Sequence, residues 1–226
     1  MIEQYRSNGY YTADDFFAVS EVDELISSLE SKQVFHYDFA AVEDHNLLHS
    51  ISCIQQIALS KIHDFIKSII GTDAIPFHAI ILNKTSLNNW GLDWHQDLKI
   101  AVRERIDMEG YDGWTEEAGI THVIPPVRVL EKIAMARIHL DDTDHTNGAI
   151  WTIPRSHLQG IIPQAQVPEV VKNNTIAGCP VKKGGVMLMS PLLLHKSPYS
   201  ISTHNRRILQ ITYRATGLAG GLKWFY

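Results

Sequence analysis

Cysteine is scarce in this chain, which carries two cysteines in 226 residues, Cys53 and Cys179. Without a CxxC pair, the sequence offers neither a disulfide framework nor a thiolate zinc site. Positive charge is also limited, because 20 lysines and arginines face 25 acidic residues and the formal net charge is -5. The basic residues form no run longer than the pairs Lys182-Lys183 and Arg206-Arg207. This distribution argues against nucleic-acid binding through neutralisation of phosphates.

Long apolar runs and targeting patterns are absent as well. No run approaches the roughly 20 apolar residues that a membrane-spanning helix needs. The first residues, Met1 to Arg6, lack the charged-then-apolar order of a signal peptide, so we expect a cytoplasmic protein. Apolar residues make up 45% of the chain and charged residues 20%, a composition typical of globular proteins. We see neither an internal repeat nor a linker, and predict one domain over residues 1–226.

Two helices are predicted in the first third of the chain. Ser20 precedes the acidic stretch Glu21 to Glu24, which is typical of an N-cap and a first helical turn. The second helix is predicted from apolar residues that recur at three- and four-residue steps, with Gly71 as the stop signal. These residues are Ile51, Ile54, Ala58, Ile62, Phe65 and Ile69. We expect the segment 12–71 to supply packing helices outside the chemistry.

Short apolar runs replace this pattern after Gly71 and predict strands. The runs cover residues 77–82, 90–100, 133–140, 149–153, 186–194 and 207–213. Asn147-Gly148 stands between two of them and predicts a hairpin, because both residues tolerate positive φ. The charged, glycine-containing stretch 103–132 predicts a long excursion or lid. Helices followed by many short strands favour an antiparallel β barrel or sandwich, with its core at about 75–214.

His95 and Asp97 are spaced so that both side chains leave one face of a predicted strand. The spacing lets them bind one metal ion together, but it is not specific. His36-Tyr37-Asp38 and His139-Leu140-Asp141 repeat it. The first of these lies between helices, and the second lies just before the predicted turn, so we interpret both as structural.

A distant histidine supports the pair at His95. His195 ends the apolar run 186–194, and two histidines with one carboxylate leave positions open on a ferrous ion. Further along, Arg206 begins a predicted strand, where a guanidinium can hold a carboxylate through paired hydrogen bonds. Only one of Arg206 and Arg207 can face inward. The polar companions Gln210 and Thr212 at even steps favour Arg206, with Arg207 as the alternative.

These residues together resemble the phytanoyl-CoA dioxygenase family. The resemblance rests on several motifs in the right order, between about Tyr10 and Tyr213. They are Trp94-His95-Gln96-Asp97, Arg137-Ile138-His139-Leu140-Asp141, Asn147-Gly148 with Ile153-Pro154-Arg155-Ser156-His157, His195-Lys196-Ser197 and Arg206-Arg207. Arg155 departs from the family, which usually has glycine there, but this position is not a metal ligand.

The resemblance implies a mainly β fold, the double-stranded β-helix or jelly roll. It also implies bound Fe(II) and the use of O2 to decarboxylate 2-oxoglutarate to succinate and CO2. At the matching positions it gives His95, Asp97 and His195 as catalytic iron ligands. Arg206, helped by Ser197, would bind the cosubstrate carboxylate.

Several other residues are candidates with a structural alternative. Gln96 points away from the metal by strand parity and more readily braces the strand, although the family sometimes places it near the cosubstrate. Trp114, in the predicted excursion, is a candidate lid residue or a candidate contact to the substrate or cosubstrate. Trp90 and Trp94 either line the pocket or pack in the core. For Lys84 we expect exposure to solvent.

The prediction is therefore an Fe(II)/2-oxoglutarate-dependent oxygenase that hydroxylates or otherwise oxidises a small molecule. One alternative is a catalytically silent, metal-binding jelly roll that serves as a binding module. Another is a cupin-type metal enzyme that does not use 2-oxoglutarate, although we find no set of three histidines with a glutamate. An aspartate at position 97 argues against the halogenases of the family. The absence of a basic patch favours a small metabolite over a CoA thioester.

Overall fold

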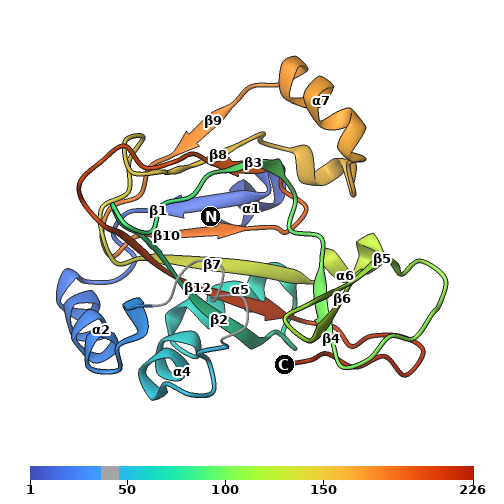
Figure 1. Cartoon of the computed structure of the whole chain (residues 1–226), viewed down its shortest axis with the longest axis horizontal. Helices are drawn as coiled ribbons and strands as arrows, with labels where there is room; N and C mark the ends of the chain where they lie inside the picture. Colours follow the sequence, from blue (N-terminus) through green and yellow to red (C-terminus); the bar gives the residue numbers. More distant parts are fainter. Residues whose placement is uncertain (37–45) are drawn as a thin grey trace.

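Two antiparallel sheets face each other and enclose the interior of the molecule (Figure 1). The computed structural model describes residues 1–36 and 46–226. The larger sheet has the strand order β1-β10-β7-β12-β2, and the smaller has the order β3-β11-β8-β9. All of their strand pairs are antiparallel. This arrangement is the jelly roll that the family resemblance implies.

The chain crosses several times between the two sheets. The larger sheet consists of β1 (Tyr10–Ala13), β2 (Ile75–Lys84), β7 (Ile133–His139), β10 (Val186–Met189) and β12 (Arg206–Arg214). The smaller sheet consists of β3 (Leu92–His95), β8 (Ile150–Thr152), β9 (Ala177–Cys179) and β11 (His195–Ser197). A third sheet contains β4 (Ile100–Val102), β5 (Asp112–Glu117) and β6 (Ile120–Ile124).

The helices lie outside the sheets. They are α1 (Ile2–Asn8), α2 (Val19–Ser31), α4 (Ser52–Ala58), α5 (Lys61–Ile70), α6 (Val127–Leu130) and α7 (Val167–Asn173). Three 3-10 turns are η1 (Val34–His36), η2 (Ser156–Gln159) and η3 (Gln164–Gln166). None of the helices in the described part of the chain combines the length and the apolar character that crossing a membrane requires.

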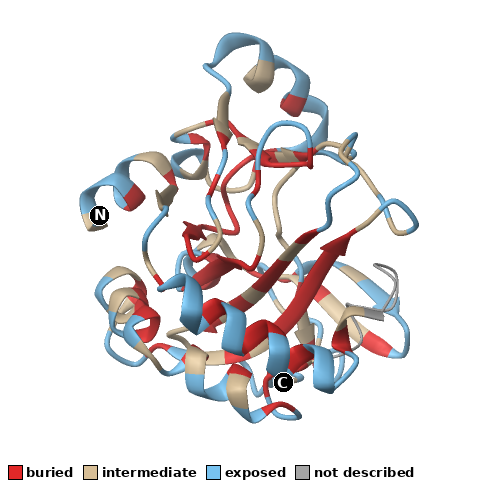
Figure 2. Cartoon of the chain, turned by 90° about the vertical axis from the view of Figure 1, so that its left-hand side faces the viewer, coloured by how far each residue is buried: buried red, intermediate tan, exposed pale blue. Residues whose placement is uncertain are grey.

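Strand β12 separates the main core from the interior of the roll. Its residues Leu209, Ile211 and Tyr213 pack with apolar residues of α2, α4 and α5 in the largest core cluster. These helices bury one side and expose the other (Figure 2). Each fully buried apolar side chain contributes roughly 1.5–3 kcal/mol to folding. The alternate residues of β12, including Arg206 and Gln210, therefore face the space between the two sheets.

The predicted helices differ from the observed ones at their ends. The second helix is two helices, because Ser60 has extended backbone and precedes α5, while its hydroxyl donates to Ile57 O at 2.7 Å. The first helix begins at Val19, so Ser20 is not its N-cap. The Glu21 carboxylate instead accepts a hydrogen bond from Ala18 N at 2.7 Å and closes the helix start.

The predicted hairpin at Asn147-Gly148 is wrong. Strands β7 and β8 belong to different sheets, so this turn carries the chain from one sheet to the other. The Asn147 side chain stabilises the turn by accepting from Asp144 N and donating to Asp142 O, each at 2.8 Å. The run 186–194 is likewise not one strand, since β10 ends at Met189 and His195 begins β11.

The segment 103–132 is folded rather than an extended loop. It contains β5, β6 and α6, and β6 pairs with both β4 and β5. Val123, Val129 and Leu130 are buried in a second core cluster. The same cluster contains Phe77 of β2 and Ile133 of β7, so the segment packs against the jelly roll through a shared apolar core.

Candidate metal centre

His95 and His195 stand opposite each other on the neighbouring strands β3 and β11. Their ring centroids are 4.3 Å apart. Asp97 follows β3, and its carboxylate oxygens lie 3.7 Å from His95 Nε2 and 3.6 Å from His195 Nε2. The donor atoms of the three residues all lie within 4.8 Å of one another, and no other such cluster occurs in residues 1–36 and 46–226.

The two imidazoles are held in the same way. His95 Nδ1 lies 2.6 Å from Asp93 O, and His195 Nδ1 lies 2.9 Å from Leu193 O. Because a carbonyl oxygen only accepts, each Nδ1 carries the proton and each Nε2 keeps its lone pair. Burial lowers the pKa of His195 to about 4, against the opposing effect of Asp97, so this ring is neutral at pH 7. Two such nitrogens and one carboxylate form a donor set that fits Fe(II).

A small cavity of about 100 Å³ opens beside the three candidate ligands and is lined by Arg206 and Ser197. Arg206 is buried, donates from Nη1 to Gly148 O at 3.0 Å, and leaves Nε without a partner. Burial lowers the pKa of Arg206 to about 9, with a smaller effect of Arg137. Arg207 faces the other way and pairs with Asp141 at 2.8 Å. The inward arginine is therefore Arg206, as strand parity and its polar companions indicated.

Lys84 is a buried cation that the sequence analysis assigned to the surface. It is the register partner of Arg206, on β2, and donates to Ser197 Oγ at 2.9 Å and to Pro198 O at 2.6 Å. Burial, with a smaller effect of Arg206, lowers the pKa of Lys84 to about 7. The expectation of solvent exposure was wrong. Lys84 lies two and four positions after Leu82 and Ile80, which face inward, and this strand alternation was the signal that could have shown that Lys84 is buried.

Gly148 lets these groups approach one another. Its carbonyl accepts from Arg206 at 3.0 Å and from Ser197 at 3.5 Å. Its φ is 87°, and a Cβ atom there would lie 2.8 Å from Lys84 Nζ and 2.9 Å from Pro198 O. The turn therefore requires glycine for both backbone conformation and space.

Arg137 is a second buried arginine beside the metal centre. It lies on β7, lines the small cavity and donates to Gln210 Oε1 at 2.7 Å, while its Nε has no partner. Burial lowers the pKa of Arg137 to about 10, and Asp97 opposes this effect.

The family model described as phytanoyl-CoA dioxygenase (PhyH) matches residues 5–208. The chain belongs to the phytanoyl-CoA dioxygenase family. Membership places it among the oxygenases that act on small molecules. A comparison of the sequence with curated proteins gave no match.

Solved structures with the same fold accompany this family assignment. The carbocyclase SnoK from nogalamycin biosynthesis has a TM-score of 0.71 and 16% identity, over 94% of this chain and 82% of its own. EctD from S. alaskensis has a TM-score of 0.70 and 18% identity, over 95% and 75%, and was also solved with 2-oxoglutarate and 5-hydroxyectoine. EvdMO1 has a TM-score of 0.67 and 19% identity over 94% of this chain, which spans only 49% of the EvdMO1 chain.

Gln96 and Trp114, which were predicted as candidate contacts to a bound molecule, make other contacts in the structure. Gln96 donates to Gly160 O at 2.9 Å and Leu192 O at 2.6 Å, and accepts from Ile162 N at 2.8 Å. Its side chain therefore ties the chain just after β3 to two loops, in line with a bracing role, and it also lines the larger cavity described below. Trp114 packs in the second core cluster, with the Arg105 guanidinium 5.5 Å from its ring centroid. Among the described residues that line the two cavities, Trp114 is absent.

The remaining aromatic and histidine candidates divide clearly. Trp90 lines the small cavity, whereas Trp94 packs in a separate cluster beneath Lys196. His139 is buried, bonds Thr143 Oγ1 at 2.8 Å and lines neither cavity, in line with a structural role. The residues that follow His36 in its pair, Tyr37 and Asp38, lie outside the described part of the chain.

A larger cavity of about 470 Å³ adjoins the small one, and Asp97, Ile80 and Gln210 line both. Its walls come from β2 and β12 of the larger sheet and from β6 of the third sheet, through His78, Thr212 and His122. The segment predicted as an excursion therefore forms one side of a cavity that reaches the metal centre.

Proposed function

We propose that this chain is an Fe(II)- and 2-oxoglutarate-dependent oxygenase that oxidises a small organic molecule and releases succinate and CO2. The observation that carries the proposal is a cluster of two histidines and one carboxylate facing the same small cavity as two buried guanidiniums. Iron bound by His95, Asp97 and His195 would supply the activation of O2 and the oxidation of the substrate. The chain's own residues bind, orient and shield the reactants.

The charges around the small cavity support a dianionic cosubstrate. Asp97 supplies the one carboxylate among the described residues that line the small cavity. Arg137 and Arg206 bring two guanidiniums to the same lining, and Lys84 lies behind Ser197. Unpaired buried charges are costly, so this excess of positive charge favours an anionic ligand. The two carboxylates of 2-oxoglutarate would supply the missing negative charge.

The positions of the two guanidiniums suit a molecule with charge at both ends. Gln210 lies four positions after Arg206 on β12 and is the register partner of Arg137. Four strand residues span about 13 Å, so the Cα atom of Arg206 lies about that far from that of Gln210. The side chains of Arg206 and Arg137 therefore approach the small cavity from opposite ends. We infer that Arg206 binds the distal carboxylate and that Arg137 faces the end nearest Asp97.

Each neighbouring residue has a defined part in this proposal. The Gly148 carbonyl accepts from both Arg206 and Ser197 and so orients the Arg206 guanidinium, and Lys84 fixes Ser197 by a hydrogen bond of 2.9 Å. The Trp90 ring lies beside both cations, with its centroid 5.1 Å from Lys84 Nζ and 5.8 Å from Arg206 Cζ. An aromatic face there excludes water and strengthens the ionic contact.

The cupin alternative receives less support. It requires a third histidine at the metal, and the described residues lining the small cavity include two, His95 and His195. A catalytically silent binding module would not need both Arg137 and Arg206 in this cavity, because burying two guanidiniums is costly without a ligand.

The test is spectroscopic and chemical. Anaerobic protein mixed with Fe(II) and 2-oxoglutarate should develop a weak visible charge-transfer band, and air should then yield succinate. Asp97→Ala should abolish both, because one of the three ligands and its negative charge are lost. Glu116→Gln, an exposed substitution on β5, is the matched control. Succinate release that is unchanged in Asp97→Ala would defeat the ligand assignment.

A further inference from the structure

We propose that the larger cavity binds an uncharged organic molecule, holding its polar group with His78, Thr212 and Gln210. The inference rests on the proposed function, because it assigns the substrate class of the same site. It depends on a difference between the two adjoining cavities: the small one is rich in positive charge, and the larger one is close to neutral.

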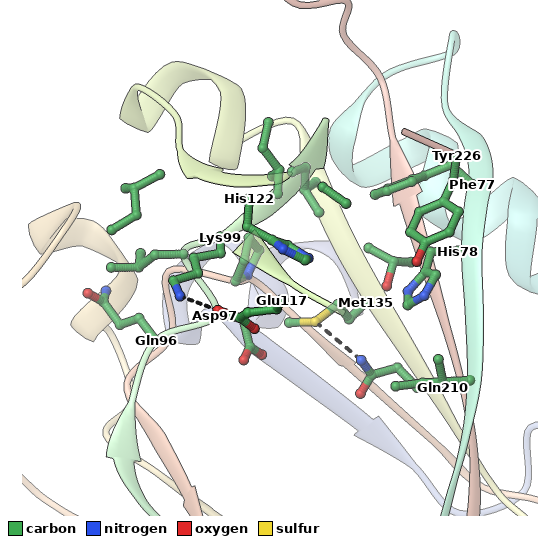
Figure 3. Close-up of a pocket in the computed structure, with 18 residues that line it drawn as sticks. Phe77, His78, Gln96, Asp97, Lys99, Glu117, His122, Met135, Gln210 and Tyr226 are labelled. Carbon is green, nitrogen blue, oxygen red and sulfur yellow. Dashed lines mark hydrogen bonds and ion pairs between the residues drawn. The ribbon is translucent and has the colours of Figure 1, made fainter. Parts of the chain in front are cut away.

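The larger cavity leads directly to the metal centre. Figure 3 shows Gln96 and Asp97 at one end and His78 with Tyr226 at the other, with His122 across from Met135 and Gln210. A volume of about 470 Å³ falls within the range of roughly 300–1,000 Å³ that is typical of sites for small organic ligands. A molecule lying along this cavity would present its near end to the metal side of Asp97.

The charged groups of the larger cavity are already compensated. Lys99 Nζ and Glu117 Oε1 form an ion pair at 2.6 Å on its partly exposed rim. Asp97 is shared with the small cavity, where it belongs to the candidate metal centre. Arg137 and Arg206 line only the small cavity. A charged group entering the larger cavity would therefore lose water without finding a counter-charge.

A polar strip on two paired strands runs from the junction of the two cavities, at Gln210, to the far end of the larger one. His78 and Thr212 are register partners on β2 and β12, and Gln210 follows on the same face. His78 Nε2 is buried without a hydrogen-bond partner, and its ring stacks on Tyr226 at a centroid distance of 4.7 Å. Burial, with His122 nearby, lowers the pKa of His78 to about 4, so the ring is neutral at pH 7.

Gln210 has donor capacity to spare. Its Oε1 accepts from Arg137, but its Nε2 has only the Met135 sulfur, at 3.8 Å. A thioether is a weak acceptor. A ligand hydroxyl, carbonyl or amide could therefore satisfy His78 and Gln210 together. The other walls are apolar and suit an organic body; they include Phe77, Ile80, Ile100, Ile124 and Ile133.

The experiment compares matched probes that differ only in charge. Naphthalene, indole and biphenyl are each used as carboxamide, carboxylate and methylammonium, and dissociation constants are measured by saturation-transfer NMR. Binding is measured on metal-free protein and on protein loaded with Ni(II) and 2-oxoglutarate. The carboxamide of at least one scaffold should bind about ten-fold more tightly than its two charged counterparts, since these are desolvated without a partner.

Three variants locate the binding. Thr212→Val and His78→Phe should each weaken the carboxamide about three- to ten-fold, and neither should change the charge-transfer band with Fe(II) and 2-oxoglutarate. Glu117→Gln removes the partner of Lys99 and should raise carboxylate affinity about three-fold. Glu116→Gln, one position away and outside the cavity lining, should leave all affinities unchanged.

Three results would overturn the inference: charged probes that bind as tightly as the carboxamides, carboxamide binding that neither Thr212→Val nor His78→Phe weakens, or no carboxamide binding at all. The proposed function has a separate readout. If wild-type protein lacks the charge-transfer band while the metal-free protein still prefers carboxamides, the oxygenase proposal fails and the cavity assignment stands.

Discussion

Arg206 and Lys84 are register partners on β12 and β2, and both side chains are buried, with Arg206 in the lining of the small cavity and Lys84 behind Ser197. Ser197 lies beside them and accepts a hydrogen bond from Lys84. Two like charges held together without an acid destabilise each other, and Arg206 contributes to the lowered pKa of Lys84. An anion bound there would relieve the repulsion.

Arg206→Ala should weaken 2-oxoglutarate binding far more than Arg207→Ala. Loss of a paired, charge-assisted contact costs roughly 1.5–3 kcal/mol, or about 10- to 100-fold in affinity. Arg207 instead bonds Asp141 and Glu30 on the outside, so its removal should reduce stability by about 1 kcal/mol and leave cosubstrate affinity unchanged. Titration of the charge-transfer band and thermal unfolding measure the two effects. A larger loss of affinity in Arg207→Ala would contradict the assignment.

Arg137→Gln should weaken the keto-acid end of the cosubstrate rather than its distal end. We expect a similar loss, about ten-fold, for 2-oxoglutarate and for 2-oxobutyrate, which lacks the distal carboxylate. Arg206→Ala should instead abolish the preference for 2-oxoglutarate over 2-oxobutyrate. Calorimetry on the Ni(II)-loaded protein gives both affinities. An Arg137→Gln variant with both affinities intact would exclude Arg137 from the cosubstrate site.

Cosubstrate binding should weaken as pH rises above about 7. The pKa of Lys84 is about 7 instead of the ordinary 10.5, so Lys84 is charged below this pH and neutral above it. A bound dianion favours the charged form, so binding takes up a proton there, with at most about a ten-fold loss of affinity per pH unit. Arg206 and Arg137, with pKa values of about 9 and 10, stay mostly charged up to pH 8.

Lys84→Met is the variant that isolates this effect. Calorimetry between pH 6.5 and 8.0, in buffers of different ionisation enthalpy, should show proton uptake in the wild type and little in Lys84→Met. The protein is loaded with Ni(II), so that the metal ligands do not titrate. Equal uptake in both proteins would assign the proton to another group.

Gly148→Ala should damage both the fold and the cosubstrate site. The added methyl group would lie 2.8 Å from Lys84 Nζ and 2.9 Å from Pro198 O, at a φ of 87°. Gly119→Ala is the matched control, since its φ is 80° and a methyl group there meets nothing within 4 Å. We expect a loss of about 1 kcal/mol from backbone strain in the control and of about 2–4 kcal/mol in Gly148→Ala. Urea unfolding measures both, and equal losses would show that space at Gly148 is not limiting.

Strand alternation made part of this site predictable from the sequence. The even steps from Arg206 to Gln210 and Thr212 indicated which arginine faces inward, because a strand repeats every two residues. The same rule places Lys84 inward, but lysine side chains are usually exposed, and the expectation of solvent exposure followed that general tendency. The hairpin predicted at Asn147-Gly148 was wrong for a related reason. Its local preference for a tight turn does not specify which strands the turn joins, and the partners of β7 are distant in the chain.

The candidate metal ligands and the cosubstrate arginines come from different sheets: His95 and His195 from the smaller, Arg137 and Arg206 from the larger. In the proposed complex a single small molecule spans the gap and becomes part of the connection between the two layers. Its departure and the loosening of the layers are then coupled events. Amide hydrogen exchange should accordingly slow in both sheets, rather than only near the ligand, when metal and 2-oxoglutarate are added together.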